Sequence, residues 1–168
     1  MNRQITDREY LYIVRDILEH QEFQRLSSIT HHGNNRYDHC VRVSFWSYRV
    51  SKFFRLDYDR VARAALLHDF FFEENEGIDK KTRTSVLVKH PQYALENASR
   101  YFELSDMEKD IISTHMFPVN LRIPKYFESW IVDLVDDIVA VYEKTYILRK
   151  QLSTSVSFMF IILLNYLR

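Results

Sequence analysis

Four histidines and two aspartates recur through the middle of the chain, separated by roughly 20 to 30 residues. In a helical bundle, inward-facing side chains from successive helices can meet at a single site. Imidazole and carboxylate groups are suitable ligands for Fe, Mn or Zn ions. No single position is persuasive, because a His-Asp pair at the end of an apolar run is commonly structural. The ordered set nevertheless predicts a buried metal centre that draws its ligands from His39, His68, Asp69, His90, His115 and either Asp136 or Asp137.

The composition narrows the chemistry to histidine and carboxylates. The chain has 168 residues, 46% of them hydrophobic, which fits one globular domain. One cysteine, Cys40, excludes an internal disulfide and a cysteine-rich zinc site. Two glycines leave little material for a glycine-rich phosphate loop. Lys+Arg and Asp+Glu both number 23, and this neutral balance argues against binding a nucleic-acid polymer or an anionic membrane.

The ends of the chain carry no recognisable targeting or membrane signal. The first residues contain no apolar stretch of the kind that a secretory signal needs. The most apolar run, Val156 to Leu167, is shorter than the roughly 20 residues that cross a bilayer. We therefore expect no transmembrane span, a cytoplasmic location, and an apolar C-terminal helix that packs internally or against another subunit of a homo-oligomer.

Hydrophobic periodicity is helical almost throughout, and β-branched alternating runs are absent, which argues against a sheet. We predict an all-α fold, a single-domain helical bundle over residues 1–168. Its metal-site core covers about 30–144 and its apolar C-terminal helix about 154–167. The other predicted helices cover about 6–26, 37–54, 57–71, 90–102, 105–116 and 127–149. Capping boxes at Thr6 and Ser105, and the His90-Pro91 pair, mark three of the predicted starts.

Three aspartates, Asp133, Asp136 and Asp137, are candidates for the last metal ligand. A helical wheel predicts that Asp133 points away from the buried arc and is solvated, while Asp136 and Asp137 flank that arc on either side. Periodicity does not choose between the two. The arc predicted to be buried consists of Ile131, Val132, Leu134, Val135, Ile138, Val139, Val141 and Tyr142.

The ordered set resembles the HD-domain superfamily of metal-dependent phosphohydrolases, and it is most similar to small single-domain bacterial members. The superfamily pattern is His…His-Asp…His…His…Asp on a helical core. The resemblance covers roughly residues 30 to 144. It rests on Arg36-Tyr37-Asp38-His39, His68-Asp69-Phe70-Phe71, His90-Pro91, Thr114-His115-Met116 and Val135-Asp136.

The resemblance implies two divalent transition metal ions, with Fe or Mn as the leading choice and Zn, Co or Ni as alternatives. It assigns His39, His68, Asp69 and Asp136 to one ligand set, and it adds His90 and His115 for the second, with Asp69 bridging. It selects Asp136 over Asp137, although Asp137 stands where the family commonly has a cation.

The implied activity is hydrolysis of a small phosphate ester, with nucleotides as the leading substrates, by attack of a metal-bridging hydroxide on phosphorus. Asp69 and Arg36 are the expected catalytic residues. Arg36 and Arg42 are candidates for phosphate binding, with a surface salt bridge as the alternative for Arg36. Glu73 and Glu74 are candidates for a general acid or base, with a solvated charged loop as the alternative that the composition favours. A non-catalytic metal- or nucleotide-binding signalling module is the main alternative, and a plain helical interaction domain is the other.

Overall fold

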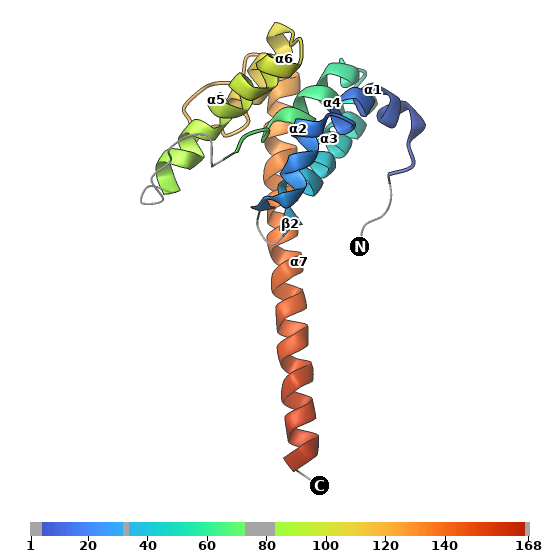
Figure 1. Cartoon of the computed structure of the whole chain (residues 1–168), viewed down its shortest axis with the longest axis vertical. Helices are drawn as coiled ribbons and strands as arrows, with labels where there is room; N and C mark the ends of the chain where they lie inside the picture. The colour runs from blue at the N-terminus through green and yellow to red at the C-terminus, as the bar shows by residue number, and fades with distance from the viewer. Residues whose placement is uncertain (1–4, 32–33, 73–82, 167–168) are drawn as a thin grey trace.

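The structure, a computed structural model, describes residues 5–31, 34–72 and 83–166 (Figure 1). Most of the described part is helical, so the predicted all-α class is confirmed. The elements are α1 (Arg8–Leu18), α2 (Gln21–Gln24), the 3-10 helix η1 (Arg25–Ser28), β1 (Thr30–His31), β2 (Asn34–Asn35), α3 (Arg36–Phe53), α4 (Tyr58–Leu67), α5 (Arg83–Tyr101), α6 (Asp106–Thr114) and α7 (Phe127–Tyr166). One small correction is a two-residue antiparallel pairing of β1 with β2, where no strand was expected.

The N-terminal region forms three short helices in place of the single helix predicted over 6–26. Asp7 is the N-cap of α1, and its carboxylate accepts hydrogen bonds from the backbone N–H groups of Glu9 and Tyr10. An aspartate makes this cap as well as a threonine does, so the start predicted at Thr6 is displaced by one residue. The helix ends at Leu18, and the chain restarts with α2 and η1.

Two of the expected histidines lie at the C-caps of helices. Helix α4 begins after Asp57, whose side chain accepts from the Arg60 N–H, and it ends with His68 as the C-cap rather than at 71. Helix α6 begins with the predicted capping box of Ser105 and Glu108 and ends with His115 as the C-cap. Each short helix therefore places an imidazole where its last backbone carbonyls are available as hydrogen-bond acceptors.

Helix α5 contains Pro91 in its interior, so the prediction that His90-Pro91 starts a helix is wrong. Proline removes one backbone N–H from the helical ladder and strains the preceding turn. Ala94 and Ala98, on the C-terminal side of Pro91, are completely buried in the core. The charged segment predicted as a loop at 73–83 lies outside the described residues, apart from its last residue, Arg83, which begins α5.

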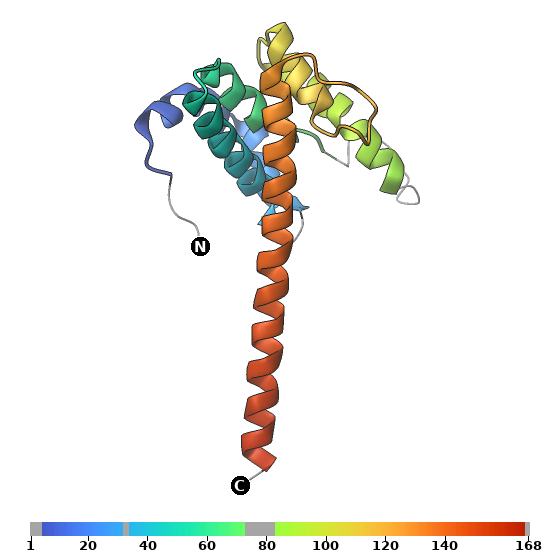
Figure 2. The ribbon, with the colours of Figure 1, turned by 180° about the vertical axis from the view of Figure 1, so that it is seen from behind.

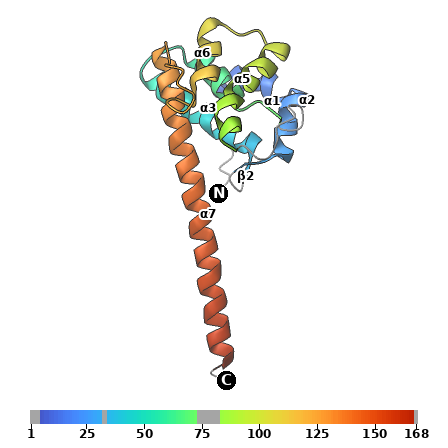
Figure 3. The same ribbon diagram turned by 90° about the vertical axis from the view of Figure 1, so that its left-hand side faces the viewer.

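The bundle is organised around the first half of α7. Helix α3 packs against both α4 and α7, and α6 packs against α4, α5 and α7. Figures 1 and 2 show α3–α4 and α5–α6 to either side of this half of α7, and Figure 3 shows α7 along one edge of the bundle. The core includes Tyr10, Ile17, Phe23, Tyr48, Leu66, Leu67, Phe70, Ile111 and Ile112, all fully buried. This arrangement brings the ends of α4 and α6 towards α3 and α7.

Helix α7 is one continuous helix of 40 residues, so the prediction of two separate helices over 127–149 and 154–167 is wrong. Its second half extends past the bundle without another described element beside it (Figures 1 to 3). Within the described residues, none of the helices has both the length and the apolar character that crossing a membrane requires.

The buried side of α7 differs from the predicted arc. Ile131, Val132, Val135 and Val139 are buried as expected. The other four members of the predicted arc, Leu134, Ile138, Val141 and Tyr142, expose between 58% and 62% of their surface. Helix α7 therefore has a second apolar face that the described bundle does not cover.

Asp133 is buried, which contradicts its predicted solvated position. The chain after α6 folds back on α7, and the Asp133 carboxylate accepts a hydrogen bond from the Phe117 N–H at 3.1 Å. Only 9% of the residue is exposed. Burial raises the pKa of Asp133 to about 7, and the nearby Asp137 carboxylate adds to this effect.

We expect Asp133→Asn to stabilise the protein at pH 8 but not at pH 4. The pKa of this carboxyl is about 7 in the folded chain against the ordinary 3.8, so stability falls as pH rises from about 4 to 7. Asparagine keeps the acceptor for Phe117 without the charge, which should add about 1–2 kcal/mol at pH 8 after allowance for solvent screening. Urea unfolding at both pH values measures the effect, with exposed Asp59→Asn as the control. Equal gains at both pH values would contradict it.

Candidate metal centre

Six side chains from five parts of the fold meet in one buried cluster. The structure brings together all six residues that the sequence singled out for metal binding, and Asp137 is exposed outside the cluster. His39 lies near the start of α3, His68 and Asp69 follow the last turn of α4, His90 lies in α5, His115 caps α6, and Asp136 lies in α7. Each of the six is at most 9% exposed.

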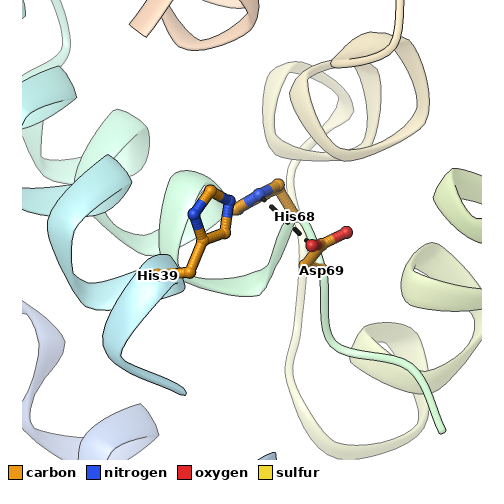
Figure 4. A group of neighbouring side chains, drawn as sticks. All are labelled: His39, His68 and Asp69. Carbon is orange, nitrogen blue, oxygen red and sulfur yellow. Dashed lines mark ion pairs between the residues drawn. The ribbon is translucent and has the colours of Figure 1, made fainter. Parts of the chain in front are cut away.

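The first half of the cluster joins α3, α4 and α7. His39 Nε2 lies 2.9 Å from Asp136 Oδ1, and His68 Nε2 lies 3.6 Å from the same oxygen. Figure 4 shows the imidazoles of His39 and His68 directed towards each other, with the Asp69 carboxylate beside His68. The ion pair marked there spans 3.9 Å, from His68 Nε2 to Asp69 Oδ2.

The second half joins α5 and α6 to the same aspartate. His90 Nε2 and His115 Nε2 lie 2.9 Å apart. They lie 3.2 Å and 3.7 Å from Asp69 Oδ1, respectively. One oxygen of Asp69 thus contacts the second pair of histidines while the other oxygen faces His68. Asp69 is therefore placed between the two halves of the cluster.

Backbone hydrogen bonds fix how two of the rings are presented. The Nδ1 atoms of His68 and His115 lie 2.8 Å from the carbonyl oxygens of Ala65 and Ile112, each in the last turn of its helix. A carbonyl can only accept, so each Nδ1 carries the proton that it donates. In the neutral ring the Nε2 lone pair then points into the cluster, which is the form that binds metal ions.

The donor set fits a divalent metal ion. The buried His68 Nε2 makes no hydrogen bond, although a buried nitrogen without a partner is costly. Three overlapping triplets have ligand atoms within 4.8 Å of one another: His39 with His68 and Asp69, His68 with His115 and Asp136, and Asp69 with His90 and His115. Neutral imidazoles and carboxylates in this number match the ligand preferences of Fe, Mn and Zn.

The electrostatics favour positive charge at the cluster. Burial would raise the pKa of Asp136, but the His68 and His39 rings lower it to about 2. Burial likewise opposes the ionisation of Asp69, yet His68 and His90 hold its pKa well below the ordinary value. Burial and the neighbouring rings of His68 and His90 lower the pKa of His115 to about 3. Burial would lower the pKa of His39, but its hydrogen bonds to Asp136 and Glu143 raise it to about 10. At neutral pH Asp69 and Asp136 are therefore ionised and His115 is neutral, while His39 carries a proton that a bound cation would replace.

Comparison with known families gives one match. The HD domain family matches residues 36–141, from the start of α3 into α7, and this segment contains all six clustered side chains. The chain is a member of the HD domain family. Searches of curated proteins and of solved structures gave no significant match.

The two arginines that the sequence put forward are both engaged with protein groups in this HD domain. Arg36 is 2% exposed and donates from a terminal guanidinium nitrogen to the Phe71 carbonyl at 2.7 Å. Its guanidinium carbon lies 3.8 Å from the centre of the Phe71 ring. Arg42 forms an ion pair with Glu143. Glu73 and Glu74 lie outside the described residues.

One charged residue next to the cluster escaped the sequence analysis. Glu143 is 1% exposed, and its Oε2 lies 3.2 Å from His39 Nδ1. It follows Asp136 by seven residues, or about two helical turns, so both carboxylates lie on one side of α7. That spacing was the available signal, but the predicted apolar arc placed the buried side of α7 elsewhere.

Proposed function

We propose that this HD domain is a metal-dependent phosphohydrolase that cleaves a small phosphate ester, with nucleotides as the leading substrate class. HD domains are a family of metal-dependent phosphohydrolases, and the formal net charge of zero favours a small substrate over a nucleic-acid polymer. The observation that carries the proposal is the convergence of four buried histidines and two buried aspartates, with unsatisfied His68 Nε2 among them.

In this proposal the six residues hold two divalent ions, with Fe or Mn as the leading choice. His39, His68 and Asp136 form one side and His90 and His115 the other, and Asp69 is shared because its carboxylate faces both halves. Such ions, when bound, supply Lewis acidity towards phosphate oxygens and towards water. The backbone bonds to His68 and His115 keep those rings in the ligand tautomer before any ion arrives.

Arg36 has a supporting role in this proposal. Its bond to the Phe71 carbonyl and its place over the Phe71 ring hold the segment that directly follows Asp69. We therefore propose that Arg36 orients the Asp69 carboxylate through this segment, since one of its terminal nitrogens and one face of its guanidinium group already contact Phe71. Because the Arg36 side chain is buried, we propose that the substrate phosphate binds at the metal cluster and not to Arg36.

Metal analysis followed by a substrate panel tests the proposal. We expect the purified protein to bind two Mn²⁺ or Fe²⁺ ions per chain and to release phosphate or a nucleotide from at least one nucleotide, dinucleoside polyphosphate or cyclic dinucleotide. Mg²⁺ alone serves as the matched condition, because imidazole-rich sites prefer transition metals. Failure to bind any transition metal would contradict the proposal. Tight binding without turnover across the panel would favour a non-catalytic binding module.

A further inference from the structure

Glu143 is a buried carboxylate that contacts the cluster without facing into it. It lies on α7 behind His39, with Oε2 at 3.2 Å from His39 Nδ1. Its other oxygen, Oε1, is engaged by a terminal guanidinium nitrogen of Arg42, which lies one turn after His39 on α3. Glu143 of α7 therefore contacts α3 at two residues, and it meets the His39 ring at Nδ1, the nitrogen on the side away from the cluster.

These contacts determine which nitrogen of His39 can meet a metal ion. The hydrogen bond to Glu143 occupies Nδ1, because a carboxylate in ionised form can only accept. Nε2 is the nitrogen that remains on the cluster side, 2.9 Å from Asp136 Oδ1. The Arg42 ion pair prevents the carboxylate from turning away, since a swing of Glu143 would break both contacts.

We propose, building on the metal-dependent function above, that Glu143 is a positioning residue that sets the tautomer and ring orientation of His39, and that Arg42 fixes Glu143. Histidine ligands generally donate their second N–H to a carboxylate or carbonyl, which raises their basicity and holds the ring. His68 and His115 use backbone carbonyls for this purpose, and His39 uses Glu143. Arg42, first considered for phosphate binding, acts in this proposal through Glu143.

The test measures Mn²⁺ affinity and the visible spectrum of the Co²⁺-loaded protein. Glu143→Gln keeps the size of the side chain but offers one acceptor oxygen for two donors. We expect Mn²⁺ affinity to fall about 10–100-fold and the Co²⁺ absorption bands to shift, because the geometry at His39 changes. Asp137→Asn is the matched control, since it removes one carboxylate from the same helix at an exposed position. Circular dichroism verifies that each variant remains helical.

The outcomes separate this inference from the proposed function. Wild-type affinity and spectrum in Glu143→Gln would overturn the positioning role while leaving the metal site intact. The same losses in Asp137→Asn would overturn it too, because they would show a general charge effect. A wild-type protein that binds no transition metal would overturn the proposed function together with this inference. If Glu143→Gln fails to fold, Arg42→Met at the half-buried end of the ion pair is expected to shift the Co²⁺ bands, and an unchanged spectrum would overturn the role.

A separate observation concerns the uncovered face of α7. Seven large apolar side chains expose between 41% and 62% of their surface along it: Phe127, Trp130, Leu134, Ile138, Val141, Tyr142 and Leu148. Four of them, at 127, 134, 141 and 148, are spaced seven residues apart, which is the spacing of a helix that pairs with another helix. We call these seven residues the α7 stripe.

A second copy of the same chain fits the α7 stripe. Each of the seven residues exposes at least 41% of its surface, so together they offer a contiguous apolar area of the kind that helix pairing buries. Exposed Asp137 and Lys144 lie on one flank of the stripe, so an antiparallel pairing of two α7 helices brings each aspartate near the lysine of the second copy. The second half of α7 extends clear of the bundle, which leaves room for a neighbouring helix (Figure 3).

We infer that two chains pair through the α7 stripe in a two-fold, antiparallel dimer. Sedimentation equilibrium should give a mass twice the 20.4 kDa of the chain. Combined Leu134→Glu and Ile138→Glu substitutions should shift the mass to that of the monomer, because they place four charges in the interface. Tyr12→Glu with Phe53→Glu, at residues 83% and 81% exposed elsewhere, is the matched control and should remain dimeric.

Three results would overturn the dimer. The first is a wild-type chain that remains monomeric at micromolar concentration, whether or not it binds lipid vesicles or another protein. The second is a dimer that survives both charged substitutions in the stripe. The third is dissociation by the control pair, since it would place the interface elsewhere.

Discussion

Asp69→Asn is expected to abolish phosphohydrolase activity, with kcat reduced by roughly 10³-fold or more at saturating Mn²⁺. The Asp69 carboxylate contacts both the His68 side and the His90–His115 pair of the cluster. Asparagine retains the volume but loses the negative charge, and only one of its two terminal atoms can donate a lone pair to a cation. Phosphate release from the best substrate of the panel measures the loss.

Metal content and a control variant show whether the loss of activity in Asp69→Asn comes from the metal site. Metal content should fall from two ions per chain, because the proposed shared ligand is weakened for both. Asp137→Asn changes the same functional group at an exposed position and should keep activity within about twofold. Asp69→Asn with two tightly held ions and activity within tenfold of wild type would contradict the assignment of Asp69.

The second large effect is stabilisation by metal ions. Mn²⁺ at about 1,000 times its dissociation constant should raise the free energy of unfolding by about 4 kcal/mol for each site that binds only the folded chain. For a chain of this length, that corresponds to a rise in Tm of roughly 8–16 °C. The physical reason is that the ion neutralises two buried carboxylates and binds His68 Nε2, which makes no hydrogen bond within the chain.

Thermal unfolding monitored by circular dichroism measures this shift, and EDTA should reverse it. Asp69→Asn provides the control, because a variant with a weakened site should show a much smaller rise in Tm. A rise of the same size in that variant would mean that Mn²⁺ acts elsewhere on the protein. An unchanged Tm in the wild type, at Mn²⁺ concentrations that give full occupancy, would contradict a site formed only on folding.

The sequence carried more information about the cluster than about the helices that build it. His68-Asp69 after an apolar run, and the order of the remaining histidines, were enough to locate six residues that the structure brings together. The capping box predicted at Ser105 is confirmed, because both of its partners lie within one helical turn. These features depend on residues that are near one another in the chain or on an ordered pattern.

Other features depend on tertiary packing, which periodicity alone does not reveal. Pro91 was predicted to start a helix, but it lies in the interior of α5. Helix α7 is apolar on two sides, so the wheel merged both sides into one arc and placed Leu134 in the core. The same error hid the buried positions of Asp133 and Glu143, whose partners come from the loop after α6 and from α3.

The length of α7 has a consequence for how the protein moves through solution. Forty residues of α-helix span about 60 Å, whereas the 19 residues of α5 span about 28 Å. The second half of α7 therefore adds length but little mass. It raises the frictional coefficient of the chain above that of a sphere of equal mass. On a gel-filtration column calibrated with globular standards, a single chain should elute ahead of its 20.4 kDa mass. The elongation also predicts a rotational correlation time longer than that of a sphere of equal mass, with slowest tumbling perpendicular to the α7 axis.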